Sequence, residues 1–250
     1  MKISVIIITL NEEKAITACL KSVAWADEII VVDSGSSDRT EEICRSFPNV
    51  RFMHQDWLGY GPQKNFTVAQ ATHQWILSLD ADETVSPELK EEILRELQAP
   101  PRYNGYHIGR KNLYRGQWVR HSGWWPEQVI RFFRKDHGQF NNRLVHESVE
   151  VTGAVGTFSG TIEHRSYHHA DEFLEKAQRY AIPGAVQMHA AGKRGSTALA
   201  IIKALAAFIK SYILKRGFLD GRVGFLIAVS GAVAVFYRIM KLIELNEHKP

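Results

Sequence analysis

Two carboxylates, Asp80 and Asp82, stand two residues apart at the end of a short apolar stretch, Trp75–Leu79. Side chains alternate along a strand, so at a strand end both would point the same way. Two anions held that close repel each other unless a cation lies between them. A hard divalent cation, Mg²⁺ or Mn²⁺, suits such oxygen ligands and would also hold a substrate phosphate. The alternative is a simple turn in front of the helix that Ser86 and Pro87 begin.

Strands and helices alternate through the first hundred residues. Runs rich in Val and Ile predict strands that are apolar on both faces, as in the centre of a parallel sheet. Asn11 is predicted to cap the first helix, and Asp38 with Glu41 to form a capping box for the second. The pattern therefore predicts an α/β fold with a mainly parallel sheet and right-handed crossovers. The predicted strands are 3–9, 28–33, 50–53 and 75–80, and the predicted helices are 12–24, a segment after residue 38, 62–71 and 88–97.

The carboxyl ends of these strands carry polar side chains. The three stretches are Thr9–Glu12, Asp33–Asp38 and Asp80–Asp82. In parallel sheets, ligands bind outside the carboxyl ends of the strands. We therefore expect this edge to hold a base, a ribose and a metal ion. No glycine-rich dinucleotide motif follows the first strand, and no Walker lysine motif is present, so those two kinds of nucleotide site are excluded.

Residues 103–165 are rich in aromatic residues and arginine, and strand-like pieces at 105–110, 128–133 and 149–151 predict an antiparallel extension of the sheet. Aromatic rings beside cations suit a sugar acceptor that carries phosphates. The alternative is ordinary core aromatics with solvated arginines. His164, His168 and His169 could suggest a metal cluster, but no carboxylate or cysteine nearby completes a plausible set of ligands. A hinge leading into a helix at 171–181 is the favoured interpretation.

The charge is divided unevenly. Residues 193–250 hold 10 Lys and Arg against 3 Asp and Glu, a net charge of +7, whereas the preceding residues are at −3. This basic tail contains two apolar segments, 198–214 and 223–237. Two such segments are expected to form a helical hairpin that lies in the cytoplasmic interface of a membrane. The alternative is a buried pair of helices that covers the sheet. Nucleic acid is disfavoured, because its binding surfaces are polar and basic rather than apolar.

The amino terminus and the cysteines indicate a cytoplasmic protein. Met1 leads directly into the first strand, with no pattern of a signal peptide. Cys19 and Cys44 form no motif and are expected to be buried thiols of a reducing compartment. We therefore expect a cytoplasmic location, with peripheral or monotopic association with the inner membrane.

Four stretches in the first hundred residues carry a family resemblance: Val5–Glu12, Ile30–Asp38, Lys64 with Asn65, and Leu79–Glu83. In order and spacing they are similar to the nucleotide-sugar motifs of family 2 glycosyltransferases, which have the GT-A fold. The resemblance implies a nucleotide-sugar-binding half at 1–100, an acceptor-side half of the same domain at 101–170, and a helical, membrane-associating tail at 171–250.

The resemblance also implies roles for individual residues. Asp33 would accept a hydrogen bond from uracil, Lys64 would lie near the phosphates, Asp80 would contact the ribose or sugar, and Asp82, with Asp80, would hold Mg²⁺ or Mn²⁺. The full set of residues implied to bind the nucleotide sugar is Thr9, Leu10, Asn11, Glu12, Asp33, Ser34, Lys64, Asp80, Ala81 and Asp82.

The general base is expected from an acidic residue after the metal motif, but the acidic pair usual in the family is absent. Glu127 stands at the corresponding place and is the first candidate, and Glu147 is the second. An inverting enzyme needs such a carboxylate to take the proton of the acceptor hydroxyl.

Later stretches resemble a smaller group of bacterial transferases that build the lipopolysaccharide inner core, among them the β-1,4-glucosyltransferase of core heptose. These stretches are Arg131–Arg134, Val145–Glu147 and Gly217–Gly221. The implied reaction moves a hexose, glucose being expected, from a UDP-sugar to a lipopolysaccharide core or lipid-linked acceptor at the membrane. Transfer to a polyprenyl phosphate, which needs no base, is the alternative. The glycine-rich opening loop of a nucleotidyltransferase is absent from the sequence, which argues against that class. The intact Asp80 and Asp82 argue against a non-catalytic sensor.

Overall fold

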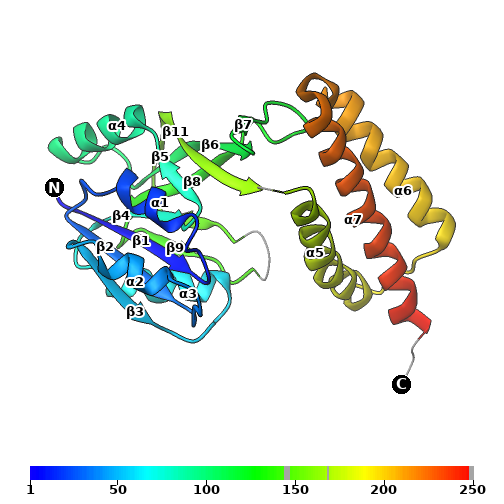
Figure 1. Cartoon of the computed structure of the whole chain (residues 1–250), viewed down its shortest axis with the longest axis horizontal. Helices are drawn as coiled ribbons and strands as arrows, with labels where there is room; N and C mark the ends of the chain where they lie inside the picture. The colour runs from blue at the N-terminus through cyan, green and yellow to red at the C-terminus, as the bar shows by residue number, and fades with distance from the viewer. Residues whose placement is uncertain (144–146, 168, 248–250) are drawn as a thin grey trace. The chain divides into compact units, whose positions relative to one another are not determined.

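The computed structural model describes residues 1–143, 147–167 and 169–247, and the chain divides into two compact units (Figure 1). The first, called the sheet unit below, comprises Met1–Arg110 and Glu127–His164. The second, called the helical unit, comprises Lys111–Pro126 and the chain from Arg165 onward. A short internal segment, residues 111–126, therefore belongs with the carboxyl-terminal helices. The three-part division expected from the sequence stays a prediction.

The main sheet has the strand order β3-β2-β1-β4-β8-β6-β11-β5, and its first four strands run parallel. The parallel strands are β1 (Ile3–Thr9), β2 (Glu28–Asp33), β3 (Val50–His54) and β4 (Trp75–Asp80). The other strands are β5 (Glu83–Val85), β6 (Gly105–Tyr114), β7 (Gln117–Trp118), β8 (Gln128–Arg134), β9 (Gly138–Phe140), β10 (Val149–Val151) and β11 (Val155–Tyr167). The antiparallel β6 and β8 confirm two pieces of the predicted extension of the sheet. The third piece, β10, is a correction, because it pairs with β9 in a separate two-stranded sheet.

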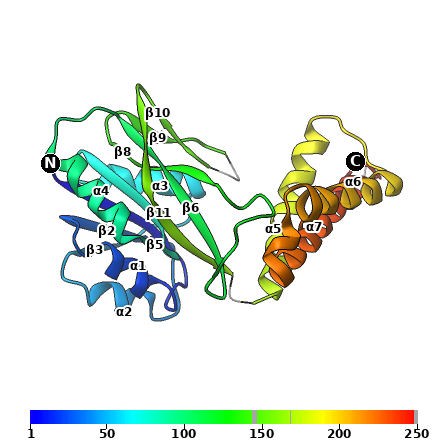
Figure 2. The same ribbon diagram turned by 90° about the horizontal axis from the view of Figure 1, so that it is seen from above.

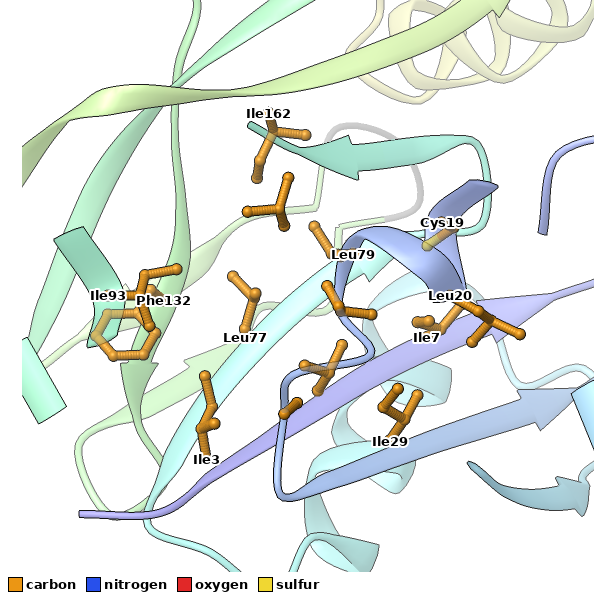
Figure 3. Close-up of a cluster of buried hydrophobic side chains, with 14 of the residues drawn as sticks. Ile3, Ile7, Cys19, Leu20, Ile29, Leu77, Leu79, Ile93, Phe132 and Ile162 are labelled. Atoms are coloured by element: carbon orange, nitrogen blue, oxygen red, sulfur yellow. The ribbon is translucent and has the colours of Figure 1, made fainter. Parts of the chain in front are cut away.

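Alternate residues of β1 point to opposite faces of the sheet, as strand geometry requires. Ile3 and Ile7 join a cluster with α1, α2 and α4, which Figure 3 shows in part, whereas Ile6 joins a second cluster with α3. Trp75 is buried at the start of β4 and stacks on Phe132 of β8, with ring centroids 4.4 Å apart. Both faces of the parallel strands are therefore covered, which explains their continuous apolar sequence. The helices are α1 (Ile16–Ser22), α2 (Thr40–Arg45), α3 (Tyr60–Gln70) and α4 (Pro87–Gln98).

The two predicted amino-terminal caps in the first forty residues are wrong, whereas the predicted start of a helix at Ser86 and Pro87 is confirmed. Asn11 has a left-handed φ of 56°, and α1 begins only at Ile16. Asp38 accepts a hydrogen bond from the backbone N–H of Thr40, and α2 has no side-chain cap. Ser86 Oγ accepts from the N–H of Leu89, with Pro87 at the first helical position.

The two cysteines lie on helices of the sheet unit. Cys19 on α1 and Cys44 on α2 are fully buried and are free thiols. Burial raises the pKa of the Cys19 thiol well above its usual range, and burial raises that of Cys44 to about 12. Neither thiol is therefore ionised at neutral pH, as expected for structural cysteines.

The helical unit is built around its last helix. It contains α5 (Asp171–Ala190), α6 (Thr197–Ile209), a π-helical turn η1 (Lys210–Leu214), a 3₁₀ turn η2 (Gly217–Asp220) and α7 (Gly221–Glu247). Helix α7 packs against both α5 and α6, as both views show (Figures 1 and 2). A small apolar cluster joins Val119 to Phe173, Val223 and Ile227. Helix α5 extends nine residues beyond the helix predicted at 171–181.

Two segments of this unit, Thr197–Leu214 and Gly217–Glu247, have the length and apolar composition to cross a membrane. The first has only 6% of its apolar window buried, and Ile202, Leu205 and Leu214 are exposed by more than half. Those side chains are not covered by the described part of the chain.

Candidate functional site

The carboxyl ends of β1, β2 and β4 meet at one edge of the sheet. In the strand register, Thr9 lies beside Asp33 and Ile8 lies beside Asp80. This confirms the expectation that the polar stretches after these strands come together. Thr9, Asp33 and Ala81 are buried, whereas Leu10 and Asn11 are exposed.

Asp33 shapes the turn that follows β2. Its Oδ2 accepts hydrogen bonds from the backbone N–H groups of Gly35 and Ser36, each at 2.8 Å, and its Oδ1 accepts from the hydroxyl of Ser36. Gly35 has a φ of 100°, which favours glycine. The Asp33 carboxylate therefore fixes this turn through both of its oxygens.

The loops after β1 and β2 are tied together by side chains. Asn11 Oδ1 accepts from the N–H of Ser37 at 2.8 Å, and Ser36 Oγ accepts from the N–H of Asn11 at 2.8 Å. The N–H of Glu12 donates to the hydroxyl of Thr40 at 2.8 Å. The polar residues of the first loop therefore hold the second loop in place, rather than capping a helix.

Lys64 of α3 is buried between two carboxylates. Its Nζ lies 2.8 Å from Asp80 Oδ1 and 2.8 Å from Glu147 Oε1. The neighbouring Asn65 bonds the backbone of Phe140 in β9 through both atoms of its amide. Lys64 thus brings Asp80 and the second base candidate, Glu147, to one place.

Arg131 of β8 holds the other oxygen of Asp80 and begins a chain of ion pairs. Its guanidinium lies 2.6 Å from Asp80 Oδ2 and 3.3 Å from Glu83 Oε1. Glu83 is fully buried, accepts a hydrogen bond from the N–H of Asp80, and lies 3.3 Å from Arg110. Arg110 binds Glu127 through two hydrogen bonds of 2.7 and 3.0 Å. Both base candidates are therefore linked to Asp80, from opposite ends of one network.

These ion pairs fix the charge states of the network. Burial alone would raise the pKa of the Asp80 carboxyl, but the charges of Arg131 and Lys64 outweigh burial and hold its pKa well below the usual range. Burial opposes the charge of Arg131, but Asp80 and Glu83 raise its pKa above the usual value. The pKa of Arg110 is also raised, because Glu127 and Glu83 outweigh its burial. Asp80 is ionised and both arginines are charged at any working pH.

Asp82 pairs with a histidine. Its Oδ2 lies 3.2 Å from Nε2 of His164 on β11. Two ligands on neighbouring corners of an octahedron with bonds of ~2.1 Å lie ~3.0 Å apart, so this pair could bind one ion. Asp80 has both oxygens in ion pairs and fits less well. Among the described residues, no group of three or more His, Cys, Asp or Glu side chains is placed to hold a metal ion.

A divalent cation fits the charge of the site. These ion pairs contain five carboxylates and three Lys or Arg cations, which leaves a formal excess of two negative charges when His164 is counted as neutral. The carboxylates are those of Asp80, Asp82, Glu83, Glu127 and Glu147, and the cations are those of Lys64, Arg110 and Arg131. A diphosphate would bring further negative charge to this edge. Mg²⁺ and Mn²⁺ are commonly held by one or two protein ligands together with substrate phosphates.

The sequence did not identify four residues of this site as functional: Glu83, Arg110, Arg131 and His164. His164 was set aside because no carboxylate or cysteine nearby completes a plausible metal site in the sequence, yet the pairing of β11 with β5 places it opposite Glu83. Arg131 was noticed only as part of a motif. His168 and two residues of the quoted motif, Val145 and His146, lie outside the described residues.

Comparison with known proteins gives the family. Residues 4–159 match the model of glycosyl transferase family 2. The lipopolysaccharide core biosynthesis glycosyltransferase LpsC of Rhizobium meliloti (strain 1021) is 30% identical over 260 residues, which cover 100% of this chain and 94% of LpsC. The uncharacterized glycosyltransferase RT0209 of Rickettsia typhi is 32% identical over 257 residues, covering 98% of this chain and 88% of the relative.

A solved structure supports the fold. The structure of S. aureus TarS 1-349 in complex with UDP-GlcNAc has a TM-score of 0.51 and 18% identity, covering 100% of this chain and 93% of that one. At this level of identity the likeness concerns the fold alone. Together, the parallel strands, the polar edge and the match over residues 4–159 show that this chain is a glycosyltransferase of the GT-A fold and belongs to glycosyl transferase family 2.

Proposed function

We propose that this protein transfers a hexose from a UDP-sugar to a lipopolysaccharide core or other lipid-linked saccharide, with inversion, at the cytoplasmic face of the inner membrane. The main observation behind the proposal is that Asp82, His164 and Lys64 lie at the same edge of the sheet as the turn formed by Asp33. The relationship to LpsC supports the lipopolysaccharide core as the destination of the sugar.

The nucleotide sugar would lie along the carboxyl ends of β1, β2 and β4. Asp33 and the polar residues after β1 would hold the uridine, and Lys64 would stabilise the diphosphate. We assign Asp82 and His164 as the protein ligands of Mn²⁺ or Mg²⁺, with Asp80 held instead by Lys64 and Arg131. When bound, the metal stabilises the negative charge that develops on the leaving diphosphate.

We assign Glu127 as the general base. Its side chain is 36% exposed and Arg110 holds it through two hydrogen bonds, so it is oriented and still accessible to an acceptor. Glu127 would take the proton of the acceptor hydroxyl as that oxygen attacks the anomeric carbon and the bond to the diphosphate breaks. Attack from the face opposite the diphosphate inverts the anomeric configuration. Glu147, which is 14% exposed and paired with Lys64, is the second candidate.

A matched pair of variants tests the base. Glu127→Gln should lower kcat by about 10²–10⁴ with little change in donor binding, the usual effect of losing a general base. Glu147→Gln is the control. If Glu147→Gln loses activity and Glu127→Gln keeps it, the two roles exchange. If neither variant affects transfer and a polyprenyl phosphate accepts the sugar, the base-free reaction replaces this proposal.

The donor and acceptor need a direct assay. A panel of UDP-sugars should be incubated with deep-rough lipopolysaccharide, with and without Mn²⁺, and the transferred sugar identified by mass spectrometry. Transfer of one hexose, dependent on Mn²⁺ or Mg²⁺ and lost on chelation, is the expected result. Full activity in excess EDTA would contradict the assignment of the metal.

The apolar helices would attach the enzyme to the membrane surface. Lys203 and Lys210 stand seven residues apart on α6 and its π-helical turn, which places them on one side of a helix whose Ile202 and Leu205 are exposed. A helix with cations along one side suits the interface better than the bilayer centre. Salt should therefore release the full-length protein only partly from membranes, and detergent should release the rest. Release of all the protein by salt alone would contradict this attachment.

A further inference from the structure

Two cations share one tryptophan in the helical unit. Lys111 Nζ lies 4.9 Å from the ring centre of Trp118, and the guanidinium carbon of Arg120 lies 4.3 Å from it. Trp125 meets the same indole edge to face, with ring centres 5.1 Å apart and planes at 86°. These four residues, called the Trp118 cluster below, are two indole rings packed at nearly right angles, the indole corner, and two positively charged side chains.

In the described part of the chain, no ion pair neutralises the cations of the Trp118 cluster. Within residues 1–143, 147–167 and 169–247, no ion pair involves Lys111 or Arg120. Their attraction to the indole accounts for about 0.5–1 kcal/mol each at exposed sites. Two like charges that share one ring also repel each other. Arg120 is also exposed to solvent. A bound anion would relieve this repulsion.

The loop that carries Arg120 is fastened to the turn between the apolar helices. Asp220, which is buried, accepts from the backbone N–H groups of Arg120 at 3.3 Å and His121 at 2.8 Å, and it pairs with the ring of His121 at 2.9 Å. The N–H of Ser122 donates to the carbonyl of Lys215 at 3.0 Å. The Trp118 cluster and the apolar helices are therefore parts of one compact unit.

The stretch Gly217–Gly221, quoted above for its resemblance, is the segment that makes this attachment. A Cβ on Gly217 would lie 2.5 Å from Ser122 Oγ and 2.9 Å from the carbonyl of Ser211, so a side chain there would push the loop away. Asp220 supplies the acceptors described above. This stretch therefore needs glycine for close approach and aspartate for attachment.

Apolar and basic side chains are exposed together on the same turn. Phe218 and Leu219 are about half exposed, and Leu214 is 73% exposed. Lys215 and Arg216 stand between them in the sequence and are also exposed. Aromatic and apolar groups enter the membrane interface while cations stay at the level of lipid phosphates. This combination indicates an anionic ligand that is itself held at a membrane, rather than one free in solution.

We propose that the Trp118 cluster is a subsite for a phosphorylated sugar of a lipid-anchored acceptor. Arg120 and Lys111 would bind the phosphate through charge-assisted hydrogen bonds, and the indole corner of Trp118 and Trp125 would pack against the apolar face of the sugar. This subsite deepens the proposed function and rests on it, because the ligand is the acceptor of the same reaction. It adds a phosphate requirement that the proposed function does not contain.

The test compares one acceptor in two forms. Deep-rough lipopolysaccharide is used before and after removal of its phosphates with aqueous hydrogen fluoride, in transfer assays with the full-length enzyme in phosphatidylcholine vesicles. Arg120→Gln should raise KM for the phosphorylated acceptor about tenfold, the size of one charge-assisted hydrogen bond lost. KM for the dephosphorylated acceptor and the rate of UDP-sugar hydrolysis should stay unchanged.

A matched control removes a charge elsewhere in the same unit. Lys241 on α7 pairs with Glu244 at 2.6 Å, and Lys241→Gln should leave both KM values at the wild-type level. Trp118→Ala should raise KM for both forms of the acceptor, because it removes the sugar platform. An Arg120→Gln enzyme that keeps the wild-type preference for the phosphorylated acceptor would overturn the subsite, as would a Lys241→Gln enzyme with the same defect.

Binding measurements separate this inference from the proposed function. Co-sedimentation of the protein with vesicles containing either form of the lipopolysaccharide reports the phosphate preference without any transfer. If wild-type protein transfers no sugar, yet Arg120→Gln alone abolishes preferential sedimentation, the subsite stands and the proposed function fails. Glucose 6-phosphate serves as a soluble competitor. Competition as strong as that of the lipopolysaccharide would show that a free sugar phosphate is the ligand and would overturn the lipid-anchored one.

Discussion

Replacing Arg131 by Met tests whether the ion-pair network holds the site together. Arg131→Met keeps the length and apolar stem of the side chain but removes the charge between Asp80 and Glu83. Glu83 is fully buried and Arg131 is 8% exposed at its side chain, so water cannot replace the lost partner easily. The variant should lower the free energy of unfolding of the sheet unit.

The loss in free energy of unfolding depends on which cationic partners Asp80 and Glu83 retain in the variant. Removing one partner of a buried ion pair costs about 3–5 kcal/mol. Asp80 keeps Lys64 at 2.8 Å, and Glu83 keeps Arg110 at 3.3 Å, so the lower end of the range applies. With about 2–4 °C lost per kcal/mol in a domain of this size, we expect a fall in Tm of about 6–12 °C.

The assay is thermal unfolding of the full-length protein in mild detergent, with amide hydrogen exchange in β4 to identify the unit that opens. Arg131→Lys keeps the charge but not the fork of the guanidinium, so its Tm should be intermediate. The double variant Arg131→Met with Glu83→Gln should lose less than the sum of its single variants, by about 1–2 kcal/mol, because the charge left unpaired has gone. The reasoning would be refuted if the losses of unfolding free energy in the two single variants were additive, or if Arg131→Met lowered Tm by less than about 2 °C.

Three further changes probe single residues. Asp82→Ala should abolish transfer without lowering Tm, and near-normal turnover of this variant would refute its metal role. Asp33→Ala should weaken UDP binding by about 1–3 kcal/mol in calorimetry, whereas unchanged affinity would contradict its role; Asp33→Asn keeps one acceptor for the turn and serves as control. Burial raises the pKa of Glu28, but hydrogen bonds from Ser4 and Thr72 outweigh burial and lower it. The ionised Glu28 therefore stabilises the fold above its unfolded pKa, and this stabilisation is lost as the pH falls through its folded pKa. Glu28→Gln should therefore lower Tm at pH 7, with the two Tm curves converging in acid, and a gap that persists in acid would contradict this.

The sequence predicts the parallel half of the fold well, for a local reason. The three strands Ile3–Thr9, Glu28–Asp33 and Trp75–Asp80 are found at the predicted bounds, because buried parallel strands require continuous apolar residues. Their polar ends then meet because parallel strands end at one edge. The site residues Thr9, Asp33 and Asp80 follow from that rule.

The remaining site residues depend on contacts that local patterns do not encode. Asn11 has the composition of a helix cap, but its amide binds Ser37, 26 residues away, and a cap cannot be told from a loop contact by spacing. Arg131 and His164 reach the site through the antiparallel strands β8 and β11. The periodicity of a strand predicts its existence but not its partner or register, so the sequence could not place these side chains beside Asp80 and Asp82.

The burial of Cys19 and Cys44 has a practical consequence for labelling. Both thiols are inaccessible and stay protonated at neutral pH, so a maleimide has no reactive native site in the folded protein. A single cysteine introduced on an exposed turn, such as Leu219→Cys, would therefore be labelled selectively without first removing the native cysteines. A spin label or an environment-sensitive dye at that position could report its depth in a bilayer, and the same probe could follow attachment and release in real time.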